Sequence, residues 1–316
     1  MLNKQIPLVL DLDGTLIRTD TFHEMMVGLL IQKPWRLLAL PFWFLKGRAY
    51  TKARLVKETT LSPYQLPYNP DLLTFAKKEA SKGRPIYLAT GSDQRVAQDI
   101  ADHVGFFQDV MGSNGHINLT GPHKKQALLE KFGVKGFDYA GDSLIDLHVW
   151  GVARKAIVVH PKKDVLNKAL KLMGQENTEV FPREKSRGIA LVLAFRPLFW
   201  ACNLLAPSWS LFLGFCLLSS GLFIGGDIIS LYKERAGSYQ KSVFAEGHLH
   251  LITGFLLAPL LILSSLFLMP LSLGLYYIPL FIVLDHLTRP FPQALRWIIL
   301  SAFQLCTVLF LQEYGF

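Results

Sequence analysis

The first half of the chain alternates short apolar runs with longer amphipathic segments. Apolar runs predict buried strands at Leu8–Leu10, 85–89 and Ala156–Val159, with weaker candidates at 110–111 and 138–140. Segments with helical periodicity lie between them at 93–104, 123–132 and 144–150. Short strands that alternate with helices favour a parallel sheet covered by helices on both faces. The pattern therefore predicts an α/β domain of the Rossmann-like kind.

The pattern changes from residue 188 onward, where apolar residues dominate. Residues 209–224 carry no charge, and this run extends past Asp227 to residue 232. Residues 251–284 are 34 residues without a charge, which is enough for two helices if residues 270–274 form a turn. Residues 296–311 predict a last span, whereas 189–206 is a doubtful one because Arg196 and Pro197 interrupt it. We expect an all-α transmembrane domain of four to five helices.

Composition separates the two halves more sharply than the whole-chain averages of 51% hydrophobic residues and a net charge of +9. Residues 1–186 hold 26 Lys or Arg and 19 Asp or Glu, whereas residues 187–316 hold 7 and 5. This apolar content excludes a disordered chain, and three cysteines exclude a disulfide-stapled domain. The excess positive charge lies mainly in the first half, where it suits an anionic membrane and a phosphate rather than a nucleic acid.

These shifts predict three segments. Residues 1–165 form the α/β domain, with a helical insertion at about 18–84; residues 166–187 form a basic linker; residues 188–316 form the membrane domain. Residues 25–48 of the insertion are aromatic and apolar with scattered cations, and Pro34 and Pro41 argue against a span. This stretch suits either a membrane interface or a helix packed on its own domain.

Polar side chains that could take part in chemistry lie at four places, three after predicted strands and one at the start of a predicted helix. Asp11, Asp13 and Gly14 follow the first strand, and Thr90 and Gly91 follow the second. Lys124 and Lys125 begin a helix, and Asp142 and Asp146 follow a later strand, one helical turn apart. Ligands of open α/β sheets bind beyond the carboxyl ends of the strands, so these side chains are expected to converge.

Clustered carboxylates are costly without a cation, so this set implies bound Mg²⁺. One carboxylate can attack phosphorus, and a second can protonate the leaving oxygen and then activate water. A hydroxyl and a lysine can hold the phosphoryl oxygens, on which charge accumulates. The sequence therefore predicts phosphoryl transfer.

The runs DLDGT, TGSD and GDSLID, with a lysine between the last two, resemble the haloacid dehalogenase superfamily of phosphohydrolases, and residues 18–84 match the place of its small helical cap. The resemblance implies Asp11 as nucleophile and Asp13 as general acid and base. It implies phosphate binding by Gly14, Thr90, Gly91 and Lys124, and a Mg²⁺ site made by Asp11, the Asp13 carbonyl, Asp142 and, in support, Asp146. Lys125 remains the alternative lysine. An acid at Asp13 favours hydrolysis over an ion pump.

The membrane half resembles the start of a UbiA-type prenyltransferase, a family that in bacteria often carries such a hydrolase domain in front. RPLFWACN at 196–203 is similar to the family's RPHQWxKN, and GDIISLYKER at 226–235 to its NDxxDxxxDR, whose acids bind Mg²⁺ and diphosphate. The departures are larger than the matches, because Gly226 and Ser230 replace an Asn and an Asp. What remains reads as a vestigial transferase site, shortened and degenerate: Asn203, Asp227, Glu234 and Arg235.

We therefore expect a Mg²⁺-dependent phosphatase of a phosphate monoester, acting through an aspartyl phosphate, on a small molecule or a lipid-linked substrate such as a polyprenyl-linked sugar phosphate. The alternatives are a UbiA-type prenyl or phosphoribosyl transferase and a non-catalytic membrane interaction protein. The first apolar run meets Asp11 too early for a secretory signal. We expect a multi-pass protein of the bacterial inner membrane whose N-terminal domain is cytoplasmic and whose partners are membrane lipids and, in addition, a full-length membrane transferase.

Overall fold

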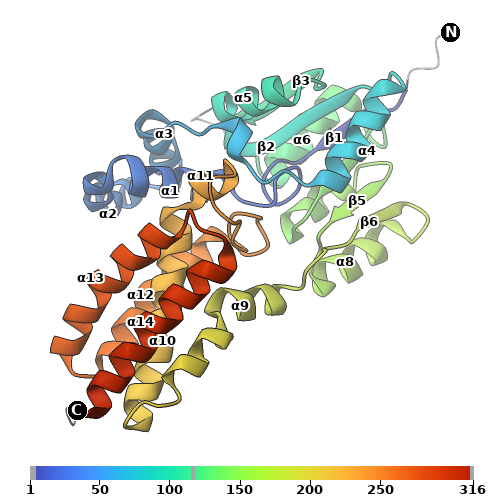
Figure 1. Ribbon diagram of the computed structural model, residues 1–316. Helices are drawn as coiled ribbons and strands as arrows, with labels where there is room; N and C mark the ends of the chain where they lie inside the picture. Colours follow the sequence, from blue (N-terminus) through green and yellow to red (C-terminus); the bar gives the residue numbers. More distant parts are fainter. Residues whose placement is uncertain (1–4, 115–117, 314–316) are drawn as a thin grey trace. The chain divides into compact units, whose positions relative to one another are not determined.

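The computed structural model describes residues 5–114 and 118–313 (Figure 1). The chain divides into two compact units, Met1–Glu184 and Lys185–Phe316, which we describe separately. The boundary agrees with the change in composition, because the first unit holds most of the charged residues.

Unit 1 contains a six-stranded parallel sheet in the order β3-β2-β1-β4-β5-β6. Its strands are β1 Leu8–Leu10, β2 Ile86–Asp93, β3 Asp109–Ser113, β4 Asp138–Gly141, β5 Ala156–Val159 and β6 Thr178–Phe181. The helices of the sheet layers are α4 Pro70–Ser81, α5 Gln94–Val104, α6 Pro122–Phe132, η3 Leu144–Asp146, α7 Leu147–Trp150 and α8 Lys163–Met173. The predicted parallel α/β sheet is confirmed, and its predicted strands and helices are all present.

Alternate residues of the strands build two cores, one on each face of the sheet. Leu8 and Leu10 point to the core that α4 and α5 cover, whereas Val9 points to the core under α6, α7 and α8. Trp150 of α7 is fully buried in the second core and donates its indole N–H to the Tyr139 carbonyl. Helices therefore cover both faces of the sheet. The edge formed by the carboxyl ends of the strands is the part where ligands can bind.

The segment expected to be a linker at 166–187 folds largely as α8 and β6. Val165, Ala169 and Met173 of α8 are buried in the second core, and β6 pairs with β5 from Ala156↔Thr178 to Val159↔Phe181. The prediction was wrong here because an amphipathic helix and an exposed edge strand both show polar residues to water. Their average composition then resembles that of a linker.

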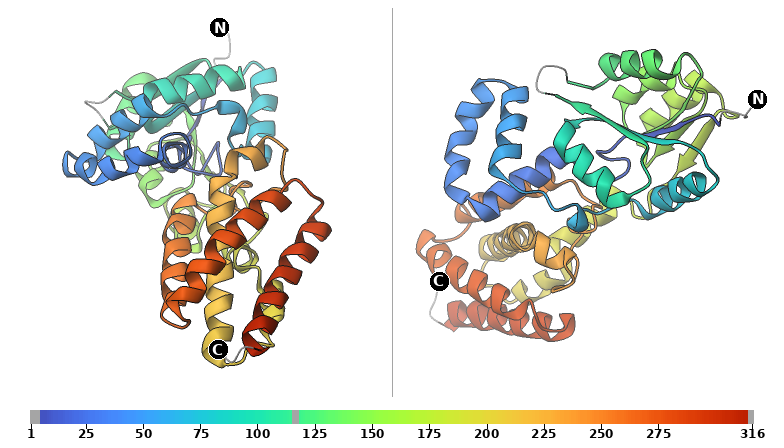
Figure 2. Two further views of the ribbon diagram at one scale, coloured as in Figure 1. Left: turned by 60° about the vertical axis from the view of Figure 1, so that its left-hand side comes forward. Right: turned by 90° about the horizontal axis from the view of Figure 1, so that it is seen from above.

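The insertion leaves and re-enters the sheet layer at one place, since Arg18 N–H donates to the Pro67 carbonyl at 2.8 Å and Ile17 bridges Tyr68. It contains α1 Thr21–Gln32, η1 Pro34–Ala39, α2 Leu40–Leu45, α3 Arg48–Glu58 and η2 Pro63–Gln65. Helices α1, α2 and α3 pack together beside the sheet (Figure 2). Because α4 covers the sheet, the insertion ends near residue 67, earlier than the expected 84.

All regular elements among the described residues of unit 2 are helices. Its elements are α9 Arg187–Phe195, η4 Pro197–Asn203, α10 Trp209–Ile229, α11 Leu231–Arg235, α12 Leu251–Leu266, α13 Leu271–Thr288 and α14 Gln293–Glu313. Helices α10, α12, α13 and α14 lie side by side (Figure 1). Gly221 allows the close approach of α12, since a Cβ there would lie 2.8 Å from Ile262 Cγ1.

Three of the described helices are long and apolar enough to cross a membrane: α10, α13 and α14. Apolar α12 is shorter, with 16 residues, and residues 189–206 are divided between α9 and η4 at Arg196, which has a φ of 52°. The expected turn near 270–274 lies between α12 and α13. Large apolar side chains such as Leu256, Tyr276 and Ile298 are exposed on α12, α13 and α14, which is typical of lipid-facing helices. These features indicate membrane association; the count of four to five spans is not confirmed.

Candidate active site

The predicted catalytic residues of unit 1 lie at adjoining strand ends. Asp11 and Asp13 follow β1, Thr90 lies within β2, and Asp142 follows β4. Since β2, β1 and β4 are neighbours and parallel, their carboxyl ends form one edge of the sheet. The backbone N–H of Asp11 donates to the Ala140 carbonyl at 3.0 Å, which fixes the end of β1 against β4.

Three carboxylates meet at this edge. Oxygen atoms of Asp11, Asp142 and Asp146 lie within 4.8 Å of one another. Gly14 makes the approach of Asp142 possible: its φ is +76°, and a Cβ there would lie 2.5 Å from Asp142 Oδ2. The chain therefore needs glycine at position 14 both for the turn and for the space.

Asp146 organises the turn that carries Asp142. Its Oδ2 accepts the backbone N–H groups of Asp142 at 3.2 Å and Ser143 at 3.0 Å, and the Ser143 hydroxyl at 2.8 Å. Its Oδ1 accepts the Tyr139 hydroxyl at 2.8 Å. With four donors around it, Asp146 is positioned to orient the turn that carries Asp142.

Lys124 is the lysine that faces Asp11. Its side chain is buried, and Nζ lies 2.8 Å from Asp11 Oδ1 and 2.9 Å from the Tyr139 hydroxyl. Lys125, the alternative, is only half-buried on the next position of α6. Tyr139 was not predicted as a site residue, although a buried hydroxyl in β4, three residues before Asp142, was the available signal. It connects Lys124 to Asp146.

Asp13 is held separately from the three clustered carboxylates. Its Oδ1 accepts the Thr21 backbone N–H at 2.7 Å, and its Oδ2 accepts the Ser92 hydroxyl at 2.5 Å. The hydroxyls of Ser92 and Thr21 lie 2.6 Å apart. Sequence reasoning missed both residues; Ser92 belongs to the same TGSD run as Thr90, but the position of Thr21 depends on how the insertion begins.

The phosphate-binding candidates Thr90 and Gly91 lie in the last part of β2, where its register with β3 shifts between Ala89 and Asp93. Thr90 is fully buried, and its Oγ1 accepts the Ser92 backbone N–H at 3.0 Å. The Gly91 carbonyl accepts Lys52 Nζ at 3.1 Å and the Ser113 hydroxyl at 2.8 Å. A Cβ at Gly91 would lie 2.3 Å from Thr120 Cγ2, so this end of β2 has no room for a side chain at position 91.

Burial and charge crowding shift the pKa values of these acids upward. Burial, together with the charge of Asp146, raises the pKa of Asp11 to about 6 despite Lys124. Burial, together with Asp20, raises the pKa of Asp13 to about 7, and burial beside Asp146 and Asp11 raises that of Asp142 well above its ordinary value. An all-oxygen donor set that is costly to ionise fits a hard divalent cation, which would relieve the repulsion. An Asp13 near neutral pKa can both give and take a proton.

A lysine pair on α6 provides a matched test. Lys124→Ala should lower phosphate release about a hundredfold or more, because it removes the buried cation beside Asp11. Lys125→Ala, one residue away, should leave the rate within about twofold, as for most surface changes. Steady-state phosphate release measures both; equal losses in the two variants would contradict the assignment of Lys124.

Alanine substitutions at two glycines with nearly equal φ, Gly14 and Gly83, distinguish the effect of backbone strain from that of displacing Asp142. Gly14→Ala should lower activity about a hundredfold and raise the Mg²⁺ concentration for half-maximal rate, because its methyl group would push Asp142 aside. Gly83 has a φ of +83° and an open Cβ position, so Gly83→Ala should cost only backbone strain, about 1 kcal/mol. Similar Mg²⁺ dependence in both variants would rule out the displacement.

The predicted transferase residues of unit 2 do not form a group with free carboxylates. Asp227 contacts Arg196 at 2.8 Å, and Glu234 contacts Arg289 at 3.0 Å. Arg235 Nε donates to the Ala245 carbonyl at 3.0 Å. Asn203 lies apart from these residues, where it accepts the side-chain amide of Gln304 at 2.6 Å and donates to Cys216.

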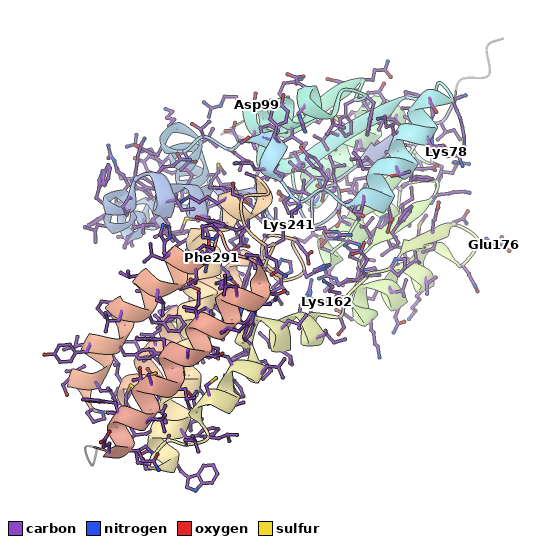
Figure 3. The ribbon with its side chains drawn as sticks, viewed as in Figure 1. Lys78, Asp99, Lys162, Glu176, Lys241 and Phe291 are labelled. Atoms are coloured by element: carbon purple, nitrogen blue, oxygen red, sulfur yellow. The ribbon has the colours of Figure 1, made fainter. Side chains whose placement is uncertain are left out.

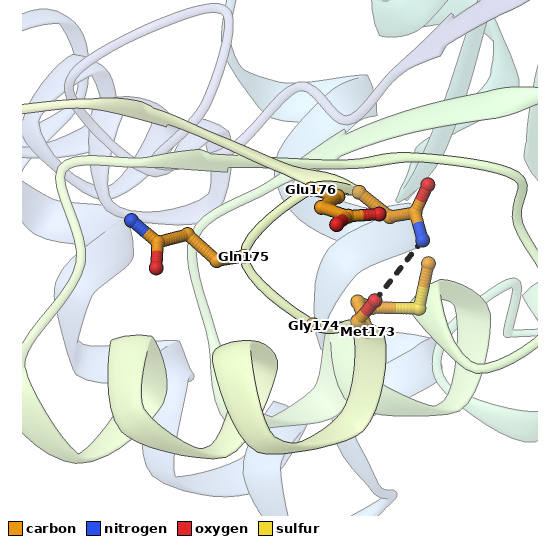
Figure 4. A pocket seen from close by; sticks show the side chains of 5 residues that line it. Met173, Gly174, Gln175 and Glu176 are labelled. Carbon is orange, nitrogen blue, oxygen red and sulfur yellow. Dashed lines mark hydrogen bonds between the residues drawn. The ribbon is translucent and has the colours of Figure 1, made fainter.

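A surface hollow of unit 1 is lined by residues 173–177, where the Asn177 amide donates to the Met173 carbonyl at 3.3 Å (Figure 4). Exposed Glu176 lies at the tip of this turn (Figure 3). The turn leads into β6, so it lies at the amino ends of the parallel strands, opposite the edge that carries Asp11. We do not count it as part of the site.

Comparison with known proteins finds a family match that covers most of unit 1. Residues 8–148 match the haloacid dehalogenase-like hydrolase family. The chain is 35% identical over 274 residues to an uncharacterized protein of Sinorhizobium fredii, y4nM; the match covers 80% of this chain but spans only about half (52%) of the relative's length.

Among solved structures, the chain is similar to a Bordetella pertussis protein of unknown function, with 14% identity, a TM-score of 0.43, and coverage of 57% of this chain and 99% of that one. A substrate-bound phosphoserine phosphatase matches at 13% identity and a TM-score of 0.41, over 60% of this chain and 99% of that one.

Proposed function

We propose that the haloacid dehalogenase-like hydrolase domain formed by residues 8–148 is a Mg²⁺-dependent phosphatase of phosphate monoesters. The observation that carries the proposal is the buried ion pair between Lys124 and Asp11, at 2.8 Å, beside two further carboxylates. A structural ion pair would not need Asp142 and Asp146 next to it. A nucleophile for phosphorus needs both a lysine for the phosphoryl oxygens and a cation site.

Each residue can be given one task. A carboxylate oxygen of Asp11 attacks phosphorus, and the bond between phosphorus and the ester oxygen breaks. The leaving oxygen takes the proton of Asp13, which hydrogen bonds to Ser92 and Thr21 hold in place. Asp13 then accepts a proton from water, whose oxygen attacks phosphorus and releases Asp11 and phosphate.

Lys124 and Thr90 hold the non-bridging oxygens during both steps. Lys124 stays charged: burial lowers its pKa, but Asp11 and Asp146 outweigh this effect and the net shift is upward. Asp11 and Asp142 would hold Mg²⁺, with Asp146 orienting them. When bound, the ion supplies positive charge that neutralises the phosphate and the crowded carboxylates.

We further propose that the substrate is lipid-linked and that the enzyme belongs to the bacterial inner membrane with unit 1 in the cytoplasm. Helices of the insertion expose Trp35, Leu38, Phe42 and Leu45 by 65–85%. Exposed cations, Arg36 and Lys46, lie among them. An apolar patch rimmed by cations suits an anionic membrane surface, and unit 2 supplies helices of membrane length. A polyprenyl-linked sugar phosphate would suit both the apolar patch of the insertion and the membrane-length helices of unit 2.

The test is phosphate release by the full chain in detergent, with p-nitrophenyl phosphate, soluble sugar phosphates and a polyprenyl-linked sugar phosphate. We expect release with Mg²⁺, none with EDTA, and the fastest turnover on the lipid-linked substrate. A hydroxylamine-sensitive phosphoryl group on Asp11 should accumulate in acid-quenched samples. Absence of release from every substrate by folded protein with Mg²⁺ would overturn the phosphatase; equal rates on soluble and lipid-linked substrates would overturn only the lipid-linked class.

A transferase in unit 2 has no comparable support. Asp227 and Glu234 are engaged by arginines, so neither carboxylate is free to hold a metal diphosphate. The phosphatase proposal therefore expects Asp227→Ala to leave phosphate release from soluble esters unchanged.

A further inference from the structure

Unit 2 contains a network of buried ion pairs in which arginines neutralise every participating carboxylate. Arg289 lies at its centre, with its side chain 3% exposed. The pairs and their distances are Arg196–Asp227 at 2.8 Å, Arg289–Asp227 at 3.5 Å, Arg289–Asp285 at 2.8 Å, Arg289–Glu234 at 3.0 Å and Arg296–Asp285 at 2.5 Å. Such pairs within apolar helices are costly to bury, so they mark a functional candidate.

This network does not fit the metal-diphosphate site that the transferase resemblance implied. A cation at Asp227 or Glu234 would have to displace a guanidinium group. Gly226 contributes to this departure from the transferase site, because a Cβ there would lie 2.4 Å from Arg289 Nη2. The missing side chain at Gly226 thus leaves the space that Arg289 occupies.

A cavity of about 430 Å³ opens beside the network, a size that falls within the range of small-molecule sites of ~300–1,000 Å³. Its polar lining includes four cations and two carboxylates: Lys185, Arg196, Lys241, Arg296, Asp227 and Glu246. Glu246 is already paired with Lys185 at 3.2 Å. The apolar part of the lining includes Leu193, Leu198 and Trp297. The cavity is therefore amphiphilic, with positive charge in excess.

One buried donor in this lining lacks an acceptor. Arg296 uses Nη2 for Asp285, but its Nε is buried without a hydrogen-bond partner among the residues that the structure describes. A buried donor without an acceptor is costly, because it has lost the hydrogen bond that water would accept from it. Lys241, exposed on the loop after α11 (Figure 3), also has no ion pair within the described part of the chain. An anion in the cavity would balance the excess positive charge of its lining, including that of Lys241.

We propose that this cavity binds the phosphate headgroup of an anionic amphiphile without a divalent metal. Arg196 and Arg296 present planar forks that suit phosphate oxygens, and Lys241 adds a point charge at the rim. The chain of the amphiphile would lie along Leu193, Leu198 and Trp297, in a unit whose helices indicate membrane association. Free phosphate shares the headgroup chemistry but gains nothing from this apolar wall.

The proposal is tested by calorimetric titration of the full chain, in neutral detergent with EDTA, with dihexanoylphosphatidic acid, dihexanoylphosphatidylcholine and inorganic phosphate. We expect saturable binding of phosphatidic acid, at least about tenfold weaker binding of phosphatidylcholine, and weak binding of phosphate. Stronger binding of phosphate than of phosphatidic acid would assign the site to free phosphate and overturn the amphiphile. Absence of saturable phosphatidic acid binding, or binding that requires Mg²⁺, would overturn the proposal.

Variants of lining residues test whether phosphatidic acid binds in this cavity. Arg296→Met should weaken phosphatidic acid binding at least about tenfold. Because that change also breaks a pair with Asp285, Lys241→Glu provides a variant at a residue that makes no ion pair within the described part of the chain, and it should weaken binding about fivefold. Lys233→Glu makes the same change at an exposed lysine outside the cavity lining and should leave affinity unchanged. Equal affinities of the Lys241→Glu and Lys233→Glu proteins would overturn the assignment of this cavity.

Discussion

Replacement of Asp11 by asparagine is expected to lower phosphate release at least about a thousandfold, because an amide cannot serve as the nucleophile that the proposed mechanism needs. The change keeps the size of the side chain and removes a charge that burial already disfavours, so the fold should persist. Steady-state phosphate release with Mg²⁺ measures the effect, and circular dichroism with a thermal scan checks folding.

Asp99→Asn is the matched control for this prediction. Asp99 lies exposed on α5 (Figure 3), so the same chemical change there should leave the rate within about twofold. A folded Asp11→Asn protein that keeps more than about a tenth of the wild-type rate would contradict nucleophilic catalysis by Asp11. The hydroxylamine-sensitive phosphoryl group should be absent from the same variant.

Replacement of Arg289 by methionine is expected to have the largest effect on the stability of unit 2, about 3–5 kcal/mol. The guanidinium contacts Asp227, Asp285 and Glu234 from a site where its own side chain is 3% exposed. Its loss leaves these carboxylates close together in apolar surroundings, with only Arg196 and Arg296 to balance them. A lower thermal midpoint of the full chain in detergent should report the loss.

A second substitution distinguishes charge imbalance from lost packing. Adding Glu234→Gln to Arg289→Met removes one unbalanced carboxylate and should recover part of the midpoint, whereas two independent losses would add. Arg187→Met, at the first position of α9, is the control and should change the midpoint little, since no ion pair of Arg187 is present among the described residues. An Arg289→Met protein as stable as the wild type would contradict a structural role of the network.

Local chemistry let the sequence predict the catalytic end of the sheet. DLDGT and GDSLID each follow a short apolar run, and parallel strands place their carboxyl ends together whatever the intervening chain does. Asp11, Asp13 and Asp142 were therefore identifiable before any contact was known. The choice between Lys124 and Lys125 was not, because one helical position decides which ammonium group enters the core and spacing alone does not fix the rotation of α6.

The sequence did not predict the residues that position the site residues by hydrogen bonds, because those contacts also depend on tertiary packing. Ser92 and Thr21 meet Asp13 only because the insertion begins where α1 brings Thr21 back to the sheet edge. Tyr139 connects Lys124 with Asp146 across two elements. Hydrogen-bond partners of this kind depend on packing between distant segments, and no local periodicity encodes them.

The sequence by itself determined that this chain joins a charged α/β domain to an apolar helical one, since composition alone decides whether a segment prefers water or lipid. It also predicted which acids of the first unit lie together at the carboxyl ends of the strands. Only the tertiary structure decided that residues 163–181 complete the sheet, and that Arg289 neutralises the acids of the second unit. In both cases the deciding partner lies far away in sequence, and burial against that partner, not the local pattern, sets the outcome.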